Sequence, residues 1–177
     1  MKKIVLQNGL IGGLIVASTM LISVYKCYSE QNFEPSYVIG FGGMALAFLF
    51  VFLGTKQYRD YTESSITFGK MFKVAFLIAL LIATIYVAVW MLVYKNFFPD
   101  FMERFSEISL KKLQESGANA QEISAKTIEM NQMKEWYKNP LFVILMTYVE
   151  ILPVGLIVTL ISALILKRTT TKQMQSA

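Results

Sequence analysis

The chain has 177 residues, of which 55% are hydrophobic and 16% are charged, and its mean hydropathy is +0.49. Soluble domains are about 45–50% apolar, so this excess, gathered into four long runs, excludes a single water-soluble domain. The net charge of +5 does not indicate nucleic-acid binding, because the basic residues cluster at the ends of the apolar runs, where anionic headgroups would lie. With no His and one Cys, Cys27, the chain lacks the residues for a His-ligated or multi-Cys metal site and for Ser-His or Cys-His catalysis.

The first apolar run predicts a membrane-spanning helix over residues 4–25. Its apolar part is longer than the roughly 7–15 residues of a signal-peptide core, so we expect an uncleaved helix. Gly9 and Gly13 form a GxxxG spacing, which lets another helix approach closely. Ordinary use of glycine in membrane helices is an equally good explanation of the same spacing.

A short loop, residues 26–36, leads to the second predicted span over residues 37–54. Gly40, Gly42 and Gly43 lie near its start, and small residues let helix backbones approach each other in a membrane. The small residues of the first two spans therefore predict that these helices pack as an antiparallel hairpin.

The second loop, residues 55–73, holds more basic than acidic residues. Lys70 and Lys73 are three residues apart and share one helix face, so their ammonium groups can reach headgroup phosphates at the membrane interface. A specific ligand site on these two lysines is the alternative. The third span follows over residues 74–94, contains no charged residue and ends with aromatic residues, as is typical of the interface.

Residues 95–140 are the one sizeable segment between predicted spans, with seven basic and seven acidic residues and therefore no net charge. Asp100 with Glu103, and Asn119 with Glu122, have the spacing of helix starts. Apolar residues recur at helical spacing behind each start, and a Ser-Gly pair separates the two stretches. The segment therefore predicts two amphipathic helices that form an extracytoplasmic insertion.

The fourth apolar run, residues 141–166, carries a single carboxylic acid, Glu150, three residues before Pro153. Glu150 lies about 14 Å into the run at ~1.5 Å per residue, near the middle of a bilayer core of about 30 Å. An ionisable group at that depth is costly and is a candidate functional residue, although apolar surroundings favour its neutral form. Pro153 has no N–H and frees the backbone carbonyl of residue 149, which could help to hold a proton or a cation.

A structural role for Glu150 is the alternative. A hydrogen bond to another polar side chain at that depth would contribute only about 0.6 kcal/mol. The polar residues at a suitable depth are Ser18, Thr19, Thr84, Tyr86 and Thr147. The four spans contain no second charged residue that could form a proton relay or an acid–base pair, so we do not expect an enzyme.

The charges of the short segments predict the orientation. The residues before the first span, the second loop and the tail after the fourth span hold nine Lys and Arg residues, whereas the first loop holds one. The seven in residues 95–140 count for less, because long segments cross the membrane largely regardless of charge. Both termini are therefore expected in the cytoplasm, with residues 95–140 outside.

Three segments resemble one bacterial family. They are KQYRDY at residues 56–61, ITFGKMFKVAF at residues 66–76 and EILPVGLIVTLISALILK at residues 150–167. They are similar to the family known only as domain of unknown function 4199, and the order of the spans agrees over nearly the whole chain. The resemblance implies a four-helix protein of the bacterial inner membrane with a variable helical segment before the last helix, and it implies no activity.

These patterns together predict an all-α integral membrane protein with four transmembrane helices and an extracytoplasmic helical segment. We expect a non-catalytic accessory or scaffold protein that contacts the lipid bilayer and binds a membrane-protein partner or further copies of itself. The alternative is a small proton- or cation-coupled transporter that uses Glu150 beside Pro153. Neither a cofactor nor a nucleic-acid partner is expected.

Overall fold

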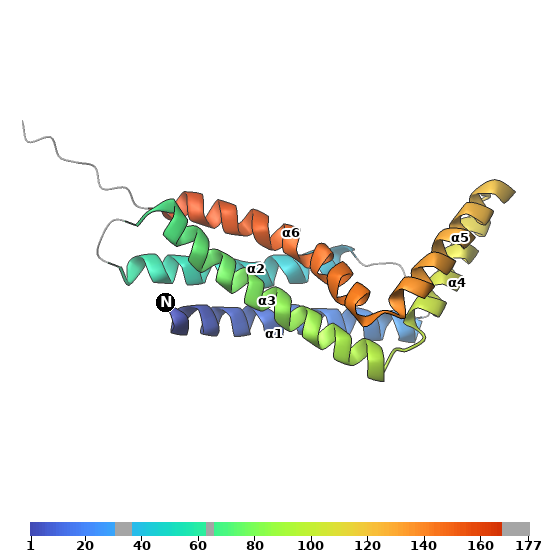
Figure 1. Ribbon diagram of the computed structural model, residues 1–177, viewed down its shortest axis with the longest axis horizontal. Coiled ribbons are helices and arrows are strands. Elements are labelled where there is room, and N and C mark those ends of the chain that lie inside the picture. Colours follow the sequence, from blue (N-terminus) through green and yellow to red (C-terminus); the bar gives the residue numbers. More distant parts are fainter. Residues whose placement is uncertain (31–36, 63–65, 168–177) are drawn as a thin grey trace, which may run out of the picture.

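The described chain folds into six helices, four of them long (Figure 1). The structure is a computed structural model, and it describes residues 1–30, 37–62 and 66–167. Within these residues the helices are α1 (Lys2–Glu30), α2 (Tyr37–Asp60), α3 (Phe68–Asn96), α4 (Phe101–Glu115), α5 (Ala120–Tyr137) and α6 (Pro140–Leu166). The long helices α1, α2, α3 and α6 lie side by side, and α4 and α5 form a helical hairpin that projects from one end of the bundle.

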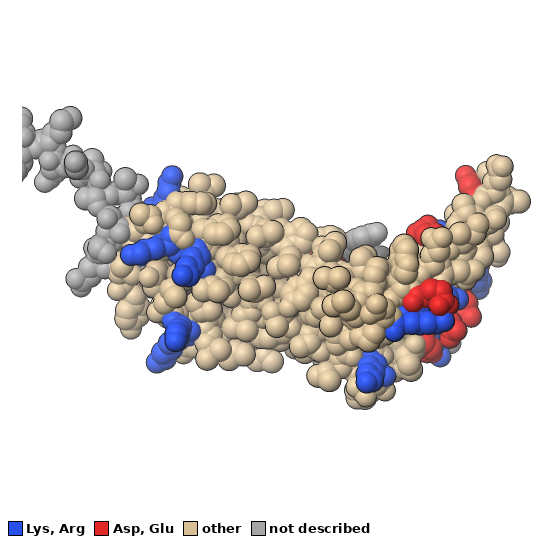
Figure 2. Space-filling model, in the orientation of Figure 1, with Lys and Arg blue, Asp and Glu red and all other residues tan. Residues whose placement is uncertain are grey.

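The four long helices have the length and the composition of membrane spans. The shortest apolar segment, Ile39–Asp60 of α2, has 22 residues and reaches about 33 Å at ~1.5 Å per residue, enough for a hydrocarbon core of about 30 Å. On the face shown in Figure 2, the charged side chains lie at the two ends of the molecule, and other residues form the surface between them. The prediction of an all-α integral membrane protein with four membrane-spanning helices is confirmed.

Helix α3 lies at the centre of the bundle and contacts α1, α2 and α6. Its buried residues recur every three or four positions and comprise Met71, Val74, Ala75, Ile78, Ala79, Ile82, Ala83, Tyr86, Val87 and Trp90. Three of them are alanines one turn apart, and such small residues let neighbouring helices come close. Because lipid is as apolar as these side chains, close packing rather than removal from water holds the helices together.

Glycines of α1 make a close approach to α3. A methyl group added at Gly9 would lie 2.5 Å from Cδ2 of Leu81, and one added at Gly13 would overlap Ile85. Both positions therefore require glycine for the helices to lie at this separation. The GxxxG face of α1 is occupied by α3 of the same chain.

Helices α1 and α2 contact each other and run in opposite directions (Figure 1), so the predicted antiparallel hairpin is confirmed. Gly43 of α2 lies directly against Thr19 of α1, where a larger side chain would overlap the threonine. Gly40 and Gly42 instead face open space, since a methyl group added at either would have no described heavy atom within 4 Å. Of these three glycines, Gly43 is the one that brings the two helices together.

The first two helices extend into the predicted short loops, so the prediction of residues 26–30 and 55–60 as loop is wrong, whereas the helix face expected at Lys70 and Lys73 is present in α3. Helix α1 continues to Glu30 and α2 continues to Asp60, while α3 begins at Phe68. An apolar run marks the part of a helix in lipid, but favourable polar pairs continue the helix beyond it. Lys26 and Glu30, one turn apart, form such a pair over 3.5 Å. The rest of the first loop, 31–36, and the predicted tail, 168–177, lie outside the described residues.

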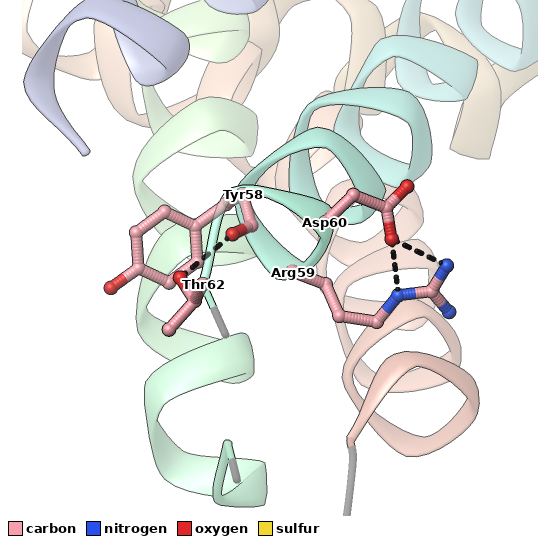
Figure 3. A network of polar contacts seen from close by, with 4 residues as sticks. All are labelled: Tyr58, Arg59, Asp60 and Thr62. Atoms are coloured by element: carbon pink, nitrogen blue, oxygen red, sulfur yellow. Dashed lines mark hydrogen bonds and ion pairs between the residues drawn. The ribbon is translucent and has the colours of Figure 1, made fainter. Parts of the chain in front are cut away.

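Polar side chains also extend the C-terminal end of α2 (Figure 3). Arg59 Nε donates a hydrogen bond of 2.8 Å to Asp60 Oδ1, and the Thr62 hydroxyl donates one of 2.9 Å to the carbonyl oxygen of Tyr58. In the same turn, Gln57 Oε1 accepts a bond of 3.1 Å from Asn8 of α1. The bond from Asn8 to Gln57 thus links α1 and α2 at the end of the bundle opposite the hairpin.

The hairpin of α4 and α5 has the predicted two helices. Asn119 Oδ1 accepts a bond of 2.9 Å from the backbone N–H of Glu122, and the Glu122 carboxylate accepts one of 3.0 Å from the N–H of Asn119, so this predicted helix start is confirmed as a capping box. Gly117, with φ of 81°, provides the turn between the helices. Helix α4 does start after Asp100, as predicted. The Asp100 side chain makes no capping hydrogen bond, however, so the predicted side-chain cap at this helix start is wrong. Met130 is the residue of α5 that is buried.

Candidate functional site

A cavity of about 720 Å³ lies at the hairpin end of the bundle. Residues of α1, α2, α3 and α6 form its walls, and residues of α4 and the last residue of α5 line it from the hairpin. Sites for small ligands usually measure about 300–1,000 Å³. The cavity is therefore large enough for a small organic molecule.

Glu150 reaches this cavity from α6. Its helix face also carries Val143, Thr147 and Ile151, which are buried, and Glu150 itself is exposed and lines the cavity. The hydroxyl of Tyr86, on α3, donates a hydrogen bond of 3.4 Å to Glu150 Oε1. This distance is long for an O–H···O bond, which is commonly about 2.7–2.8 Å. The carboxyl group is therefore weakly held and faces open space.

Tyr86 is the one candidate partner that the structure places against Glu150. Thr147 and Thr19 also line the cavity, but each donates its hydroxyl proton to the backbone of its own helix, over 2.7 Å and 2.9 Å. Thr84 donates to its own helix over 2.7 Å, so Tyr148 is the donor in their contact of 3.0 Å. The sequence predicted the depth of these groups but not which of them share a face.

Pro153 lies apart from the cavity. It is exposed on α6, and so is Val149, whose backbone carbonyl loses its helical partner because proline has no N–H. The residues that line the cavity include Glu150 but neither of these two. The expected combination of an acid with a freed carbonyl is therefore not formed at one site in this structure.

Aromatic side chains line the part of the cavity nearest the α4–α5 hairpin and attach the hairpin to the bundle. Trp90 of α3 meets Phe101 of α4 edge to face, with ring centroids 5.2 Å apart. Tyr137 at the end of α5 packs against Tyr94 at 6.1 Å. Phe105 completes the aromatic lining on the hairpin side. Aromatic rings are apolar and also attract cations, so such a lining suits apolar and cationic ligands.

A polar clasp joins the start of α4 to the end of α1. The Tyr28 hydroxyl donates a bond of 2.9 Å to Asp100 Oδ1, and Arg104 Nε donates to the other carboxylate oxygen. The guanidinium also lies 5.1 Å from the centroid of the Tyr28 ring. Hydrogen bonds from Arg104, and then from Tyr28, hold the pKa of the Asp100 carboxyl below its usual range. The sequence showed no signal for this contact, which joins residues 72 positions apart.

The other lining residues at the end of α1 are Lys26, Cys27 and Glu30. Cys27 is a free, partly buried thiol, and Lys26 and Glu30 form the ion pair described above. Within the described ranges, no three His, Cys, Asp or Glu side chains are grouped to hold a metal ion. The Asp, Glu, Lys and Arg side chains in the lining are thus one acid at depth and one ion pair near the hairpin.

The cavity borders the apolar core of the bundle, since its lining residues Val16 and Met20 belong to the main core cluster. The fully buried members of that cluster include Phe48, Val51, Ile78 and Ile82, with 0% of their surface exposed. Further along α6, buried hydroxyls recur at Thr159 and Ser162, and neither forms a hydrogen bond within the described part of the chain.

The remaining predicted site residues lie away from the cavity. Gly9, Gly13 and Gly43 lie at contacts between helices of the same chain, as described above. Lys70 and Lys73 are exposed on the first turns of α3, at the end of the bundle opposite the hairpin. Their contact with lipid headgroups stays a prediction.

The segments that carry the family resemblance map to three helix regions. Residues 56–61 form the end of α2, residues 66–76 form the start of α3, and residues 150–167 form the part of α6 from Glu150 onward. No curated protein and no solved structure matches the chain. A family model does match residues 7–168, nearly the whole chain. The chain therefore belongs to the family described as "Protein of unknown function (DUF4199)".

Proposed function

We propose that this chain is a non-catalytic membrane protein that binds another membrane component in the cavity beneath the α4–α5 hairpin. The observation that carries the proposal is the cavity itself, about 720 Å³ in volume, with Glu150 exposed in it. Most of its walls are apolar or aromatic, with a few polar groups, which is the usual composition of a ligand site. The chain has no His to act as a general base beside the single thiol.

The proposal places the cavity on the outer side of a bacterial inner membrane, with both termini in the cytoplasm. On the face shown in Figure 2, Lys and Arg lie at the end where α1 begins, whereas both signs of charge occur on the hairpin. Basic residues are retained on the cytoplasmic side of membrane proteins. This distribution supports an outward-facing hairpin.

Filling the cavity tests the proposal. Gly40 lines the cavity, and a Cβ added there would have no described heavy atom within 4 Å, so the ring of Gly40→Trp should occupy part of the cavity. Gly42 also has room but does not line the cavity, so Gly42→Trp is the matched control. Native mass spectrometry of protein purified from its own membranes should show a bound small molecule in the wild type and in Gly42→Trp, and none in Gly40→Trp. Equal occupancy in all three proteins, or none in the wild type, would overturn the proposal.

A second candidate function is a proton- or cation-coupled transporter, which the placement of Glu150 in a cavity at mid-depth favours. Transport would require the tightly packed core residues Phe48, Val51, Ile78 and Ile82 to move apart, because they have no exposed surface in this conformation. Vesicles containing the protein would then show a proton or cation flux that Glu150→Gln abolishes. A flux equal to that of empty vesicles would exclude this candidate.

A partner on the outer surface of the hairpin also stays a proposal. Ile128 of α5 is 58% exposed, and Met130 is the residue of α5 that is buried, so much of this helix is available for contact. The mass of the protein in lipid nanodiscs distinguishes a single chain from a complex with further copies or with another protein.

A further inference from the structure

We infer that the molecule bound in the cavity is an organic ammonium with an apolar body, and that Glu150 receives its ammonium group. The inference rests on the proposed function and specifies the class of ligand. It depends on three properties of the described cavity: one carboxyl group at depth, aromatic rings above it and aliphatic walls around it.

The carboxyl group selects against anions and favours cations. A carboxylate has about four lone-pair positions for hydrogen bonds, and among the described residues Glu150 accepts a long one from Tyr86, at 3.4 Å. A charge among apolar side chains is stabilised by a paired opposite charge and by further hydrogen bonds. An ammonium group supplies both, because it carries a positive charge and up to three N–H donors.

The aromatic rings favour a cation over a neutral ligand. Tyr86, Trp90, Phe101 and Tyr137 line the same cavity as Glu150. The faces of such rings attract ammonium groups by roughly 0.5–2 kcal/mol, more when the site is shielded from water. A neutral alcohol or an amide of the same size would gain less from these rings.

The basic residue of the cavity does not offset this preference. Lys26 lies at the end of α1 and is paired with Glu30 over 3.5 Å, so the pair has no net charge. The charged lining therefore has one net negative group, Glu150, if the acid is ionised with a ligand bound. Charge complementarity then favours a cationic head.

The walls favour an aliphatic body. Met20, Met44 and Met146 line the cavity together with Val16 and Val24. Methionine is flexible and adapts to irregular apolar shapes. The ligand class is thus an amphipathic amine, and its ammonium could belong to a free lipophilic amine or to the headgroup of an aminolipid.

Cys27 allows binding to be measured in the full-length protein. It is the single cysteine of the chain and lines the cavity, so a bound ligand should slow its alkylation by a maleimide. The probes are dodecylammonium, dodecanol and dodecanoate, which share one tail and differ in the charge of the head. The control is Ser29→Cys in a Cys27→Ser background, because Ser29 is exposed two residues away and does not line the cavity.

Dodecylammonium should protect Cys27 at a concentration about tenfold below that needed for dodecanol, since a hydrogen bond to a charged group accounts for a difference of this size. Glu150→Gln should remove that difference, and Gly40→Trp should leave Cys27 insensitive to all three probes. The control thiol should respond to none of them. Each variant counts as folded if it elutes from a size-exclusion column at the same volume as the wild type.

Nanodisc composition distinguishes the two sources of the ammonium. Protection of Cys27 in discs that contain phosphatidylethanolamine, but not in discs of phosphatidylglycerol alone, identifies an aminolipid. Protection only after dodecylammonium is added identifies a free amine. Equal protection by dodecanol and dodecylammonium, unchanged in Glu150→Gln, would overturn the ammonium inference and leave the proposed function standing. Protection by no probe in any disc would overturn both.

Discussion

Two pairs of glycines, one on each side of the cavity floor, differ in the space around them. Below the cavity, a methyl group added at Gly12 would lie 2.8 Å from the backbone oxygen of Ala47, and one added at Gly54 would lie 2.7 Å from Ile78. At the hairpin end, Gly40 and Gly42 have no described heavy atom within 4 Å of such a group. Glycine therefore marks tight packing at Gly12 and Gly54 and free space at Gly40 and Gly42, while Gly43 of the same turn of α2 packs against Thr19.

This difference indicates where the structure is built for stability and where it is built for binding. Close packing is the main force between helices in lipid, so the lower half contributes most to holding the fold. The half next to the hairpin is less closely packed, and Glu150 lines the cavity that it contains. A hollow that coincides with the one acid of the four spans is expected of a binding site.

Labelling from outside gives the largest expected difference between the two ends. In a Cys27→Ser background, Ser29→Cys lies at the hairpin end of α1, and Tyr61→Cys follows α2 at the opposite end, where Tyr61 is 80% exposed. A membrane-impermeant maleimide added to intact cells should label the cysteine at 29 and leave the one at 61 unlabelled until the cells are lysed. The opposite pattern would reverse the proposed orientation. Cys27→Ser alone gives the background.

Adding a side chain to each half should separate them by stability. Gly12→Val forces side-chain atoms into Ile82 and the backbone of Ala47, and overpacking of this kind costs about 1–3 kcal/mol. Gly42→Val enters free space, so its free energy of unfolding should stay within about 0.5 kcal/mol of the wild type. Unfolding in mixed detergent, followed by circular dichroism, measures both. A loss of stability in Gly42→Val as large as that in Gly12→Val would show that the half next to the hairpin is packed as tightly as the lower half.

Much of the fold could be predicted from the sequence because lipid imposes a simple rule. Long apolar runs must form helices to satisfy their backbone hydrogen bonds, and the predicted runs correspond to α1, α2, α3 and α6. The start of α5 was predictable because Asn119 and Glu122 form a local motif with a fixed spacing. The ends of α1 and α2 were not, since hydropathy marks the membrane and not the end of the helix.

The site could be predicted only in part. Glu150 was identifiable because a lone acid in an apolar run is unusual, but its partner depends on the rotation of α3 against α6, and this placed Tyr86 rather than Thr84 beside it. The cavity depends on how far the helices separate at the hairpin end, and no residue pattern records that. The roles of Gly9 and Gly40 differ for the same reason, since the spacing of glycines does not say which helix they face.

Two hydrogen bonds between α3 and α6 provide a smaller test of whether groups at the cavity contribute less to stability than groups packed outside it. Tyr148 bonds to Thr84 over 3.0 Å, and Tyr86 bonds to Glu150 over 3.4 Å beside the cavity. Tyr148→Phe should lower the free energy of unfolding by about 0.6 kcal/mol, the average for such bonds in membranes, and Tyr86→Phe should lower it by less. The same unfolding assay measures both variants. A larger loss in Tyr86→Phe would mean that Glu150 serves the fold more than the cavity.

The smallest expected effect is a pH dependence of the clasp that holds the hairpin over the cavity. The pKa of Asp100 is lowered, first by its hydrogen bond from Arg104 and then by that from Tyr28, so the clasp is stabilised at pH values above the usual range of an aspartate, about 3.9. This stabilisation is lost as the pH falls through the lowered pKa, when Asp100 takes up a proton. Hydrogen exchange at the start of α4, measured by mass spectrometry after incubation at each pH, should increase only at the acid end. In Asp100→Asn the side chain carries no charge, so exchange there should already be faster at neutral pH and should lose this acid step. If the acid step persists in Asp100→Asn, another carboxylate holds the hairpin, and the clasp is not what positions the aromatic rings above Glu150.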